Sequence, residues 1–295
     1  MIDLHTHTSL SDGSCTPTEL LDQARQAGLI ALAITDHDTL AGFDQALPHA
    51  HRYGLELVCG VEVSTTFHCD KLPGRHLSPH LLGYFLRQPP DATFRRWLNS
   101  ISSTRRDRNL QLMNKLRMSN LNISWDDFPN LGPESAARPH FAKVLMAKGY
   151  VSSSREAFDH FLADSVLHGI QRNLPSTQDA IRKITENDGL AVLAHPARNG
   201  TRERSALSAV VDHLVKSGMS GIEVHHSDHS AEDVSLLLEL ATHCDLFVTG
   251  GSDFHGENKP DIRLGTGRCG NVHIPYELLQ TMKSFKSGKT AAKER

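Results

Sequence analysis

The strongest constraint on the fold of this chain is a series of short apolar runs, each about as long as a β-strand and each bounded by polar residues. Most of these runs alternate with segments of helical periodicity, which is the order expected of βα units. Their hydrophobicity is continuous, and this suits parallel strands that are buried on both faces. The seven runs are Ile2 to Leu4, Leu29 to Ile34, Leu55 to Val61, Leu81 to Phe85, Leu190 to Ala194, Gly221 to Val224 and Leu246 to Val248.

Helix start signals support this order. Thr16, Pro17 and Glu19 form the pattern of a capping box with proline in the first helical position. Ser176 with Asp179 begins another helix in the same manner. Because strands with helical crossovers favour a closed barrel over an open sheet, the sequence predicts an α/β fold, a distorted seven-stranded TIM-like (β/α) barrel.

The regular spacing of the strand candidates breaks between Phe85 and Leu190, where no convincing strand occurs. We interpret this stretch as a helical insertion with short helices at Arg138 to Ala147 and Arg155 to Leu162. The predicted organisation is a first barrel part over residues 1–90, a substrate-facing helical insertion over 91–175 and a second barrel part over 176–295.

The first part of this insertion is strongly basic. Between Arg95 and Arg117 the single acid is Asp107, and the local charge is +6. The simplest explanation of this charge is a helix face exposed to solvent. The more specific alternative is that it guides a phosphorylated substrate towards the site.

Composition limits the classes of function. The formal net charge of −3 over 295 residues gives no overall basic field for indiscriminate nucleic-acid binding. The apolar stretches fall far short of the roughly 20 residues that a membrane-spanning helix needs, so we expect no membrane role. Met1 to His7 lacks a basic region and is interrupted by Asp3, so we expect no signal peptide and a cytoplasmic location. The five cysteines are odd in number and form no CxxC pair, which predicts reduced thiols. No feature indicates an obligate protein partner.

Histidines and carboxylates stand at the ends of the apolar runs. His5 and His7 follow the first run, and two residues that are two apart in an extended strand point the same way. The strand ends of a barrel meet at one mouth, where such folds carry their active sites, so we expect these side chains to converge. The strand-end residues are His5, His7, Asp12, Asp36, His37, Asp38, Glu62, His80, His195, Glu223, Asp253 and His255.

Each of these residues alone has an ordinary structural explanation. A single histidine beside a strand is usually a hydrogen-bonded core residue, and a single aspartate after a strand is usually a helix cap or a turn residue. The set as a whole resists that explanation, because so many imidazoles and carboxylates in one cleft would leave repulsive or unpaired groups. Bound metal removes the difficulty. Imidazole and carboxylate ligands without thiolate suit Zn, Mn or Fe, and the set is large enough for two or three ions.

Five motifs of this chain, taken in order and combination, resemble those of the PHP (polymerase and histidinol phosphatase) superfamily. Within it the chain is most similar to a branch of stand-alone phosphoesterases that includes a nucleoside 3',5'-bisphosphate phosphatase and a 5'-to-3' exoribonuclease. An Arg-x-His-Phe-Ala sequence in the insertion of that branch is matched by Arg138 to Ala142. The five motifs are His5-Thr6-His7 with Ser11-Asp12-Gly13, Thr35-Asp36-His37-Asp38, Gly60-Val61-Glu62, Ala194-His195-Pro196 and Gly251-Ser252-Asp253-Phe254-His255.

The resemblance implies a role for particular residues. Arg138 and His140 of the insertion would contact substrate phosphate, Arg198 would also bind substrate, and His229 matches a further family position near the site. The implied ligands are His5, His7, Glu62 and Asp253 for one ion, Glu62, His80 and His195 for a second with Glu62 bridging, and Asp12, His37 and His255 for a third.

The expected activity is hydrolysis of nucleotide phosphate monoesters, of a nucleoside monophosphate or a 3',5'-bisphosphate, by attack of a metal-bridging hydroxide. A metal-bound water, Asp38 or His229 would protonate the leaving oxygen. An exoribonuclease acting on short 5'-phosphorylated RNA is the alternative, and an amidohydrolase is a weaker one because Glu62 and the Asp253-x-His255 pair fit a phosphoesterase better. A non-catalytic module is disfavoured by the intact ligand set.

Overall fold

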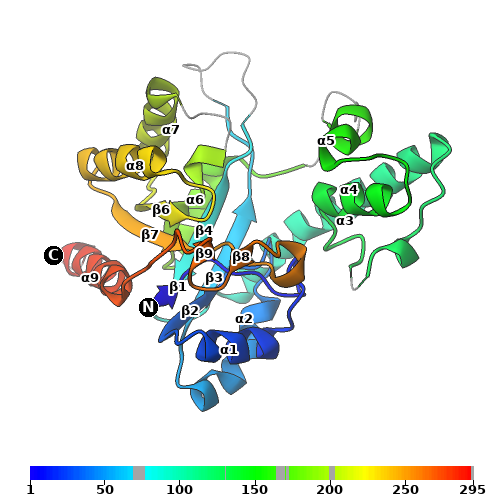
Figure 1. The fold of residues 1–295 in the computed structure, drawn as a ribbon. Coiled ribbons are helices and arrows are strands. Elements are labelled where there is room, and N and C mark those ends of the chain that lie inside the picture. The colour runs from blue at the N-terminus through cyan, green and yellow to red at the C-terminus, as the bar shows by residue number, and fades with distance from the viewer. Residues whose placement is uncertain (69–76, 130, 164–169, 171–172, 199–202, 294–295) are drawn as a thin grey trace. The chain divides into compact units, whose positions relative to one another are not determined.

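The computed structural model describes residues 1–68, 77–129, 131–163, 170, 173–198 and 203–293. Within these residues every one of the seven apolar runs forms a strand of one sheet, which confirms the predicted α/β barrel (Figure 1). The strands are β1 (Ile2–Asp3), β2 (Ala31–Ile34), β3 (Glu56–Ser64), β4 (His80–Phe85), β5 (Leu190–Leu193), β6 (Gly221–His226) and β7 (Phe247–Gly251).

The strands follow one another in the sheet from β1 to β7. All neighbouring pairs are parallel except those of β4, which runs antiparallel to both β3 and β5. This corrects the expectation of parallel strands throughout, because continuous hydrophobicity reports burial on both faces and not strand direction. In the register of β3 with β4, Ser64 pairs with His80. The reversed strand therefore brings its first residue to the end of the barrel where its neighbours finish.

The sheet nearly closes between β1 and β7. The backbone N–H of Leu4 donates to the carbonyl of Gly250 (3.3 Å), and that of His7 donates to the carbonyl of Phe254 (2.9 Å). A Cβ added to Gly251 would lie 2.3 Å from the Cβ of His5. Only glycine allows this approach, which brings His5 beside the end of β7.

Helices surround the sheet (Figure 1). The predicted caps of two of them are confirmed: the Thr16 side chain accepts from the backbone N–H of Glu19 (3.3 Å), and the Ser176 side chain accepts from that of Asp179 (3.0 Å). The helices of the barrel are α1 (Pro17–Gln26), α2 (Ala41–Ala50), α6 (Thr177–Glu186), α7 (Arg204–Lys216), α8 (Ala231–His243) and α9 (Tyr276–Lys293), with 3₁₀ turns at His51–Tyr53, Pro196–Arg198 and Gly256–Asn258 and a hairpin of β8 (Ile262–Arg263) and β9 (Gly267–Arg268).

The barrel core consists of apolar side chains from the strands and from α9, with Leu82, Tyr84 and Met282 completely buried. The Tyr84 hydroxyl donates to the carbonyl of Leu4 (2.7 Å), so its polar atom is satisfied inside this core. None of the helices in the described ranges is both long enough and apolar enough to cross a membrane.

Residues 99–174 form a second compact unit. It contains most of α3 (Ala92–Met118), a 3₁₀ turn (Trp125–Asp127), α4 (Arg138–Ala147), α5 (Ser154–Ala157) and a π-helical turn (Phe158–Leu162). Phe128, Phe141 and Leu145 belong to a core of its own. The helices predicted around 138–147 and 155–162 are present here, and the function of this unit as a substrate-facing lid stays a prediction.

The basic residues of α3 have several protein partners. Arg95 binds Asp44 of α2, and the Nε of Arg117 donates to the carbonyl of Ile123 (2.8 Å). Arg105 and Arg108 are buried. These four side chains are therefore not a simple solvated face, and their charge is partly used inside the protein.

Candidate metal centre

The polar strand-end residues gather at one mouth of the barrel. The structure brings all nine predicted metal ligands into one network of contacts, although their function as ligands stays a prediction. They are His5 and His7 after β1, Asp12 in the next loop, His37 after β2, Glu62 in β3, His80 at the start of β4, His195 after β5, and Asp253 and His255 after β7.

The backbone turns sharply where several of these strands end. Asp38, His195 and Asp253 have positive φ angles of 57°, 28° and 58°. Such angles are uncommon for residues other than glycine and cost roughly 1–3 kcal/mol, so they persist only where the surrounding structure holds them. The mouth of the barrel is thus a place where the fold accepts local strain to direct side chains inwards.

Glu62 lies at the centre of this network. Its Oε1 is 2.7 Å from Nδ1 of His80 and 2.7 Å from Nε2 of His195. Its Oε2 is 3.2 Å from a ring nitrogen of each of His5, His7 and His37. Burial would raise the pKa of Glu62, but the surrounding imidazoles outweigh it and hold that pKa well below its usual range. One ionised carboxylate therefore faces five imidazoles.

Asp12 and Asp253 extend the network on either side. Asp12 Oδ1 is 3.2 Å from Nε2 of His255, and its Oδ2 is 3.6 Å from Nε2 of His37. Asp253 Oδ1 is 3.3 Å from Nε2 of His7. Both carboxyl groups are buried, yet nearby cationic groups lower the pKa of each well below its usual value. Both are therefore ionised at neutral pH.

The donor atoms of these side chains fit a divalent cation. Within the described ranges, both ring nitrogens of His7, Nε2 of His5 and Oε2 of Glu62 are buried and make no hydrogen bond, which is costly for polar atoms. Imidazole nitrogen and carboxylate oxygen are ligands of Zn, Mn and Fe. Among the described residues, four groups have ligand atoms within 4.8 Å of one another: His7, Asp12, His37 and His255; His5, His7, Glu62 and Asp253; His37, Glu62 and His80; and His5, Glu223 and His226.

The imidazoles report where negative charge is concentrated. Burial would lower the pKa of His7, but Asp253, Glu62 and Asp12 outweigh it and raise the pKa to about 9. The pKa of His5 is likewise raised well above its usual value, against burial, by Glu223, Glu62 and Asp253. In contrast, burial lowers the pKa of His195 to about 3. The field around His5 and His7 therefore favours a cation.

Glu223 holds two of the predicted ligands in place. His5 Nδ1 donates to its Oε1 (2.8 Å), and the backbone N–H of His195 donates to its Oε2 (2.7 Å). Burial would raise the pKa of Glu223, but His5 and other imidazoles lower it to about 2. A carboxylate that fixes the far nitrogen of a ligating histidine sets its tautomer and orientation. The sequence placed Glu223 at a strand end but did not predict this support of His5 and His195.

His226 also supports the site and was not predicted from the sequence. The backbone N–H of Asp228 donates to its Nδ1 (3.0 Å), so the neutral ring carries its proton on Nε2, which is 3.4 Å from Asp253 Oδ2. A β-bulge between Glu223 and His225 shifts the register of β6. Simple alternation from Glu223 would direct His225 inwards, but the bulge buries His226 and leaves His225 partly exposed.

A further set of buried carboxylates supports the loops of the mouth. Asp36 accepts hydrogen bonds from the backbone N–H of Thr8 (2.7 Å), the Thr8 hydroxyl (2.7 Å) and the Ser11 hydroxyl (2.6 Å). Asp3 accepts from the backbone N–H groups of Ser252 (2.9 Å) and Gly265 (2.8 Å). These bonds fix the loop before Asp12 and the turn before Asp253.

The two candidate leaving-group acids have different surroundings. Asp38 accepts from the backbone N–H of Ser64 (2.7 Å) and from its hydroxyl (2.9 Å), so both carboxylate oxygens have a structural partner. His229 donates from Nδ1 to the carbonyl of Val224 (2.7 Å) and keeps a buried Nε2 lone pair. Burial, together with His226, lowers the pKa of His229. Both oxygens of Asp38 already accept hydrogen bonds, whereas Nε2 of His229 makes none in the described residues and can accept and release a proton.

Two cationic side chains lie against Asp253. Arg198, a predicted substrate-binding residue, donates from Nη1 to Asp253 Oδ2 (2.9 Å), and its Nε is 3.5 Å from Asp228. Lys259 donates from Nζ to the same oxygen of Asp253 (2.7 Å). Lys259 was not predicted from the sequence. No motif marks it, although it follows His255 by only four residues.

The two predicted substrate contacts of the insertion lie in α4. Arg138 donates from Nη1 to the carbonyl of Leu162 (3.3 Å), and its guanidinium carbon is 5.9 Å from the centre of the Phe158 ring. Nδ1 of His140 accepts from the backbone N–H of Ala137 (2.9 Å), which caps the start of the helix. Both side chains therefore have a structural contact within this unit.

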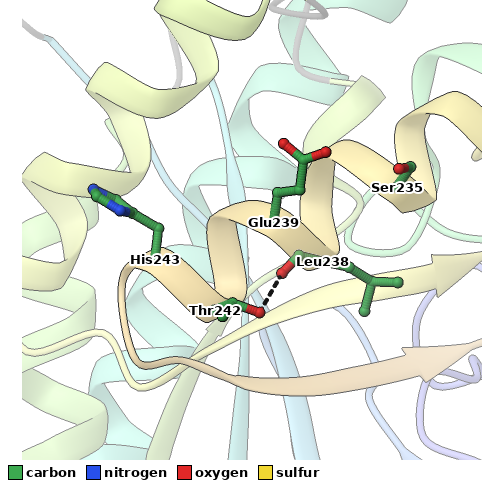
Figure 2. A pocket seen from close by; sticks show the side chains of 5 residues that line it. All are labelled: Ser235, Leu238, Glu239, Thr242 and His243. Carbon is green, nitrogen blue, oxygen red and sulfur yellow. Dashed lines mark hydrogen bonds between the residues drawn. The ribbon is translucent and has the colours of Figure 1, made fainter.

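A hollow on α8 is a separate surface feature (Figure 2). Its lining residues are spaced as one face of the helix, and all are exposed. Thr242 uses its hydroxyl within the helix, donating to the carbonyl of Leu238 (2.9 Å). The lining residues are Ser235, Leu238, Glu239, Thr242 and His243, and none of them belongs to a group of potential metal ligands found in the described residues.

Comparison with known families decides the assignment. Residues 3–162 match the PHP domain family. The chain belongs to this family. The 3',5'-nucleoside bisphosphate phosphatase of Chromobacterium violaceum is 33% identical over 88% of this chain and 90% of its own length. A 5'-3' exoribonuclease of Haemophilus influenzae is 32% identical over 86% of this chain and 89% of its own length. A phosphoribosyl 1,2-cyclic phosphate 1,2-diphosphodiesterase of Eggerthella lenta is also 32% identical, over 86% of this chain and 94% of its own length.

Solved structures agree with the fold of this PHP protein. A candidate metal-dependent phosphoesterase of Bifidobacterium adolescentis has a TM-score of 0.79 and 30% identity, and the match covers 96% of each chain. A Chromobacterium violaceum protein described as an amidohydrolase, with bound sulfate and no metal, has the same TM-score and identity over 95% of this chain and 96% of its own. Family and relatives together make this PHP protein a metal-dependent enzyme that hydrolyses phosphoric esters.

Proposed function

We propose that this PHP protein hydrolyses phosphate monoesters of nucleotides, either nucleoside monophosphates or nucleoside 3',5'-bisphosphates, and uses two or three divalent ions of Mn, Zn or Fe. The observation that carries the proposal is the position of Glu62, whose two oxygens contact five imidazoles. A carboxylate in that position can serve two neighbouring ions. The name of the relative from C. violaceum supports the nucleotide as substrate.

The ligands divide into three sets in this proposal. Ions held by them supply Lewis acidity when bound, which makes water a better nucleophile and neutralises charge on the phosphoryl group. Glu223 and His226 orient His5 and Asp253 for this purpose. The sets are His5, His7, Glu62 and Asp253; Glu62, His80 and His195; and Asp12, His37 and His255.

Protonation of the leaving oxygen belongs to His229 in this proposal. Its Nδ1 donates to the carbonyl of Val224, and its Nε2 makes no hydrogen bond in the described part of the chain. A proton on Nε2 would therefore be available to the leaving oxygen. His229→Gln should slow substrates with an alkoxide leaving group by about 10²-fold and p-nitrophenyl phosphate far less, because p-nitrophenolate leaves without protonation. Equal losses on both kinds of substrate would show that His229 does not protonate the leaving oxygen.

Arg138 and His140 are the proposed contacts for the remainder of the substrate, and Arg198 is a proposed contact at the mouth. Metal ions recognise any phosphoryl group, so selection among nucleotides must come from other contacts. A guanidinium can hold a second phosphate with two parallel hydrogen bonds. We also place the enzyme in the cytoplasm, since Cys15, Cys59, Cys244 and Cys269 are free thiols.

A second candidate function is 5'-to-3' exonucleolytic cleavage of short 5'-phosphorylated RNA. The relative from H. influenzae and the exoribonuclease Rnm of Escherichia coli, which is 31% identical over 89% of this chain, favour it. The description of the C. violaceum structure as an amidohydrolase keeps amide hydrolysis as a third outcome to test.

The experiment is a substrate panel assayed with the purified, Mn-loaded protein. It contains nucleoside monophosphates, nucleoside 3',5'-bisphosphates, a 5'-phosphorylated RNA of a few nucleotides and a dipeptide. We expect release of inorganic phosphate from the nucleotides. Release of mononucleotides from the RNA, at a higher kcat/KM than any phosphate release, would establish the exoribonuclease instead. Hydrolysis of the dipeptide alone would overturn both.

A further inference from the structure

We propose that Lys259 binds a non-bridging oxygen of the phosphoryl group that is hydrolysed, and that it thereby favours phosphate groups with two negative charges. The proposal rests on the proposed function, because it names the substrate charge that the same site selects. It concerns a residue in the barrel and is independent of the insertion.

The ammonium group of Lys259 lies close to the proposed metal ligands. Lys259 Nζ is 2.7 Å from Asp253 Oδ2, and the other oxygen of that carboxylate is 3.3 Å from Nε2 of His7. The ammonium is therefore separated from the proposed ligand atoms of His5, His7 and Glu62 by a single carboxylate group. A phosphoryl group bound to an ion at those ligand atoms would lie beside Asp253, where Lys259 would be able to donate to one of its oxygens.

Asp253 Oδ2 has one more donor beside it than it uses. It accepts from Lys259 Nζ (2.7 Å) and from Arg198 Nη1 (2.9 Å), and these two bonds occupy its two lone-pair sites. Nε2 of His226 is 3.4 Å away and makes no hydrogen bond in the described residues. His226 can therefore take the place of Lys259 on this oxygen when Lys259 turns towards another acceptor.

Lys259 is the donor that can turn away most easily. Arg198 is also held by Asp228, and His226 is fixed by the backbone N–H of the same residue. The Lys259 side chain forms no ion pair besides the one with Asp253 in the described ranges. Its side chain is 32% exposed, while its backbone N–H is anchored to the carbonyl of Gly256 (3.1 Å). A flexible side chain on a fixed backbone can move between Asp253 and a bound substrate.

The chemistry of the ammonium group fits a phosphoryl oxygen. It is a compact charge with three rotatable donors, and a charge-assisted hydrogen bond to phosphate is among the stronger ones in proteins. A phosphate monoester carries up to two negative charges near neutral pH and a diester carries one. A cation beside the reacting group therefore stabilises the monoester more. The presence of Lys259 favours phosphatase activity over cleavage of diesters.

The test compares Lys259→Gln and Lys259→Arg with the control Lys216→Gln. Lys216 is exposed at the end of α7, so its variant makes the same change of charge away from the mouth. Each Mn-loaded protein is titrated with inorganic phosphate in a calorimeter, its metal content is measured by mass spectrometry, and kcat/KM is determined for p-nitrophenyl phosphate and bis-p-nitrophenyl phosphate.

We expect Lys259→Gln to weaken phosphate binding at least about tenfold and to reduce kcat/KM for the monoester about 10²-fold, but for the diester by less than about tenfold. Lys259→Arg, which keeps the charge, should recover most of the monoester activity. Lys216→Gln should match the wild type, and metal content should be equal in all four proteins.

Three results would overturn the proposal. They are unchanged phosphate affinity in Lys259→Gln, equal losses on monoester and diester, or loss of bound Mn, which would make Lys259 only a support of Asp253. Phosphate binding that depends on Lys259 in a protein that hydrolyses no phosphate ester would leave the anion site in place and refute the proposed function. The two failures are therefore distinguishable.

Discussion

Two sets of buried carboxylates at the same end of the barrel differ in what surrounds them. The supporting set, Asp3, Asp36 and Asp38, accepts hydrogen bonds from backbone N–H groups and hydroxyls. The central set, Glu62, Asp12 and Asp253, faces imidazoles. The supporting set is satisfied by the chain itself, whereas atoms of the central cluster such as Glu62 Oε2 make no hydrogen bond in the described ranges. The supporting set therefore stabilises the fold, whereas the central set has atoms that can bind a metal ion.

The direction of the pKa shifts expresses the same difference. Burial raises the pKa of Asp3 and of Asp36, although their hydrogen bonds oppose it. Burial acts on Glu62 and Asp253 too, but their cationic neighbours reverse the outcome. Substitutions in the supporting set should therefore reduce stability, and substitutions in the central set should reduce activity.

Asp253→Asn is expected to have the largest effect on catalysis. The amide keeps the shape of the side chain but removes a charge that faces His5 and His7, so kcat should fall by about 10³-fold with little change in the midpoint of thermal unfolding. Steady-state kinetics and a melting curve measure both. A large drop in the melting temperature with activity largely kept would place Asp253 in the supporting set.

Asp36→Ala should reduce stability more than catalysis, which is the opposite of the effect expected for Asp253→Asn. It leaves the buried backbone N–H of Thr8 and two hydroxyls without their acceptor, which should reduce the free energy of unfolding by about 2–3 kcal/mol. Urea unfolding measures the change, with Glu186→Ala in an exposed ion pair as a nearly neutral control. An unchanged unfolding midpoint for Asp36→Ala would refute a supporting function for Asp36.

Arg138→Ala tests whether the insertion contributes contacts that the barrel does not. We expect kcat/KM for a nucleoside 3',5'-bisphosphate to fall about 10 to 10²-fold and that for p-nitrophenyl phosphate to change little, because the latter has no second phosphate to hold. The Arg138 contacts with Leu162 and Phe158 supply the competing explanation. Equal losses on both substrates would assign Arg138 to the stability of its unit.

Cys59 shows what burial does on β3 without surrounding imidazoles. It lies three residues before Glu62, and burial raises its pKa from 9.0 to about 12, with Arg95 opposing. A raised pKa favours the folded state below about pH 9, and this contribution is lost as the pH rises towards 12. Native Cys59 should resist iodoacetamide at pH 9, while exposed Cys269 reacts, as mass spectrometry of the peptides would show. Comparable labelling of both would contradict the shift.

Strand positions and the convergence of the nine side chains could be predicted because both depend on local pattern. Apolar runs define the strands, and the residues that end them must meet where the sheet closes. Strand direction could not be predicted in the same way, since β4, which is antiparallel to both of its neighbours, is as apolar as the parallel strands of the sheet. His80 reaches the site only because β4 is reversed.

The supporting contacts were harder to predict because they depend on tertiary geometry. The burial of His226 results from a β-bulge that interrupts the alternation of β6. Arg198 and Lys259 meet at Asp253 from different loops, and no spacing in the sequence indicates that meeting. Metal-binding patterns can be recognised in a sequence, whereas the residues that orient the ligand side chains are recognised only in the folded structure.

The most direct test of a metal-dependent hydrolase at this mouth is removal and return of the ions. The protein is treated with a chelator, dialysed, and assayed with a phosphate monoester before and after addition of Mn, with circular dichroism as the control for folding. We predict that activity falls to background while the secondary structure persists, and that Mn restores it. Undiminished hydrolysis by protein shown to be metal-free by mass spectrometry would contradict the account.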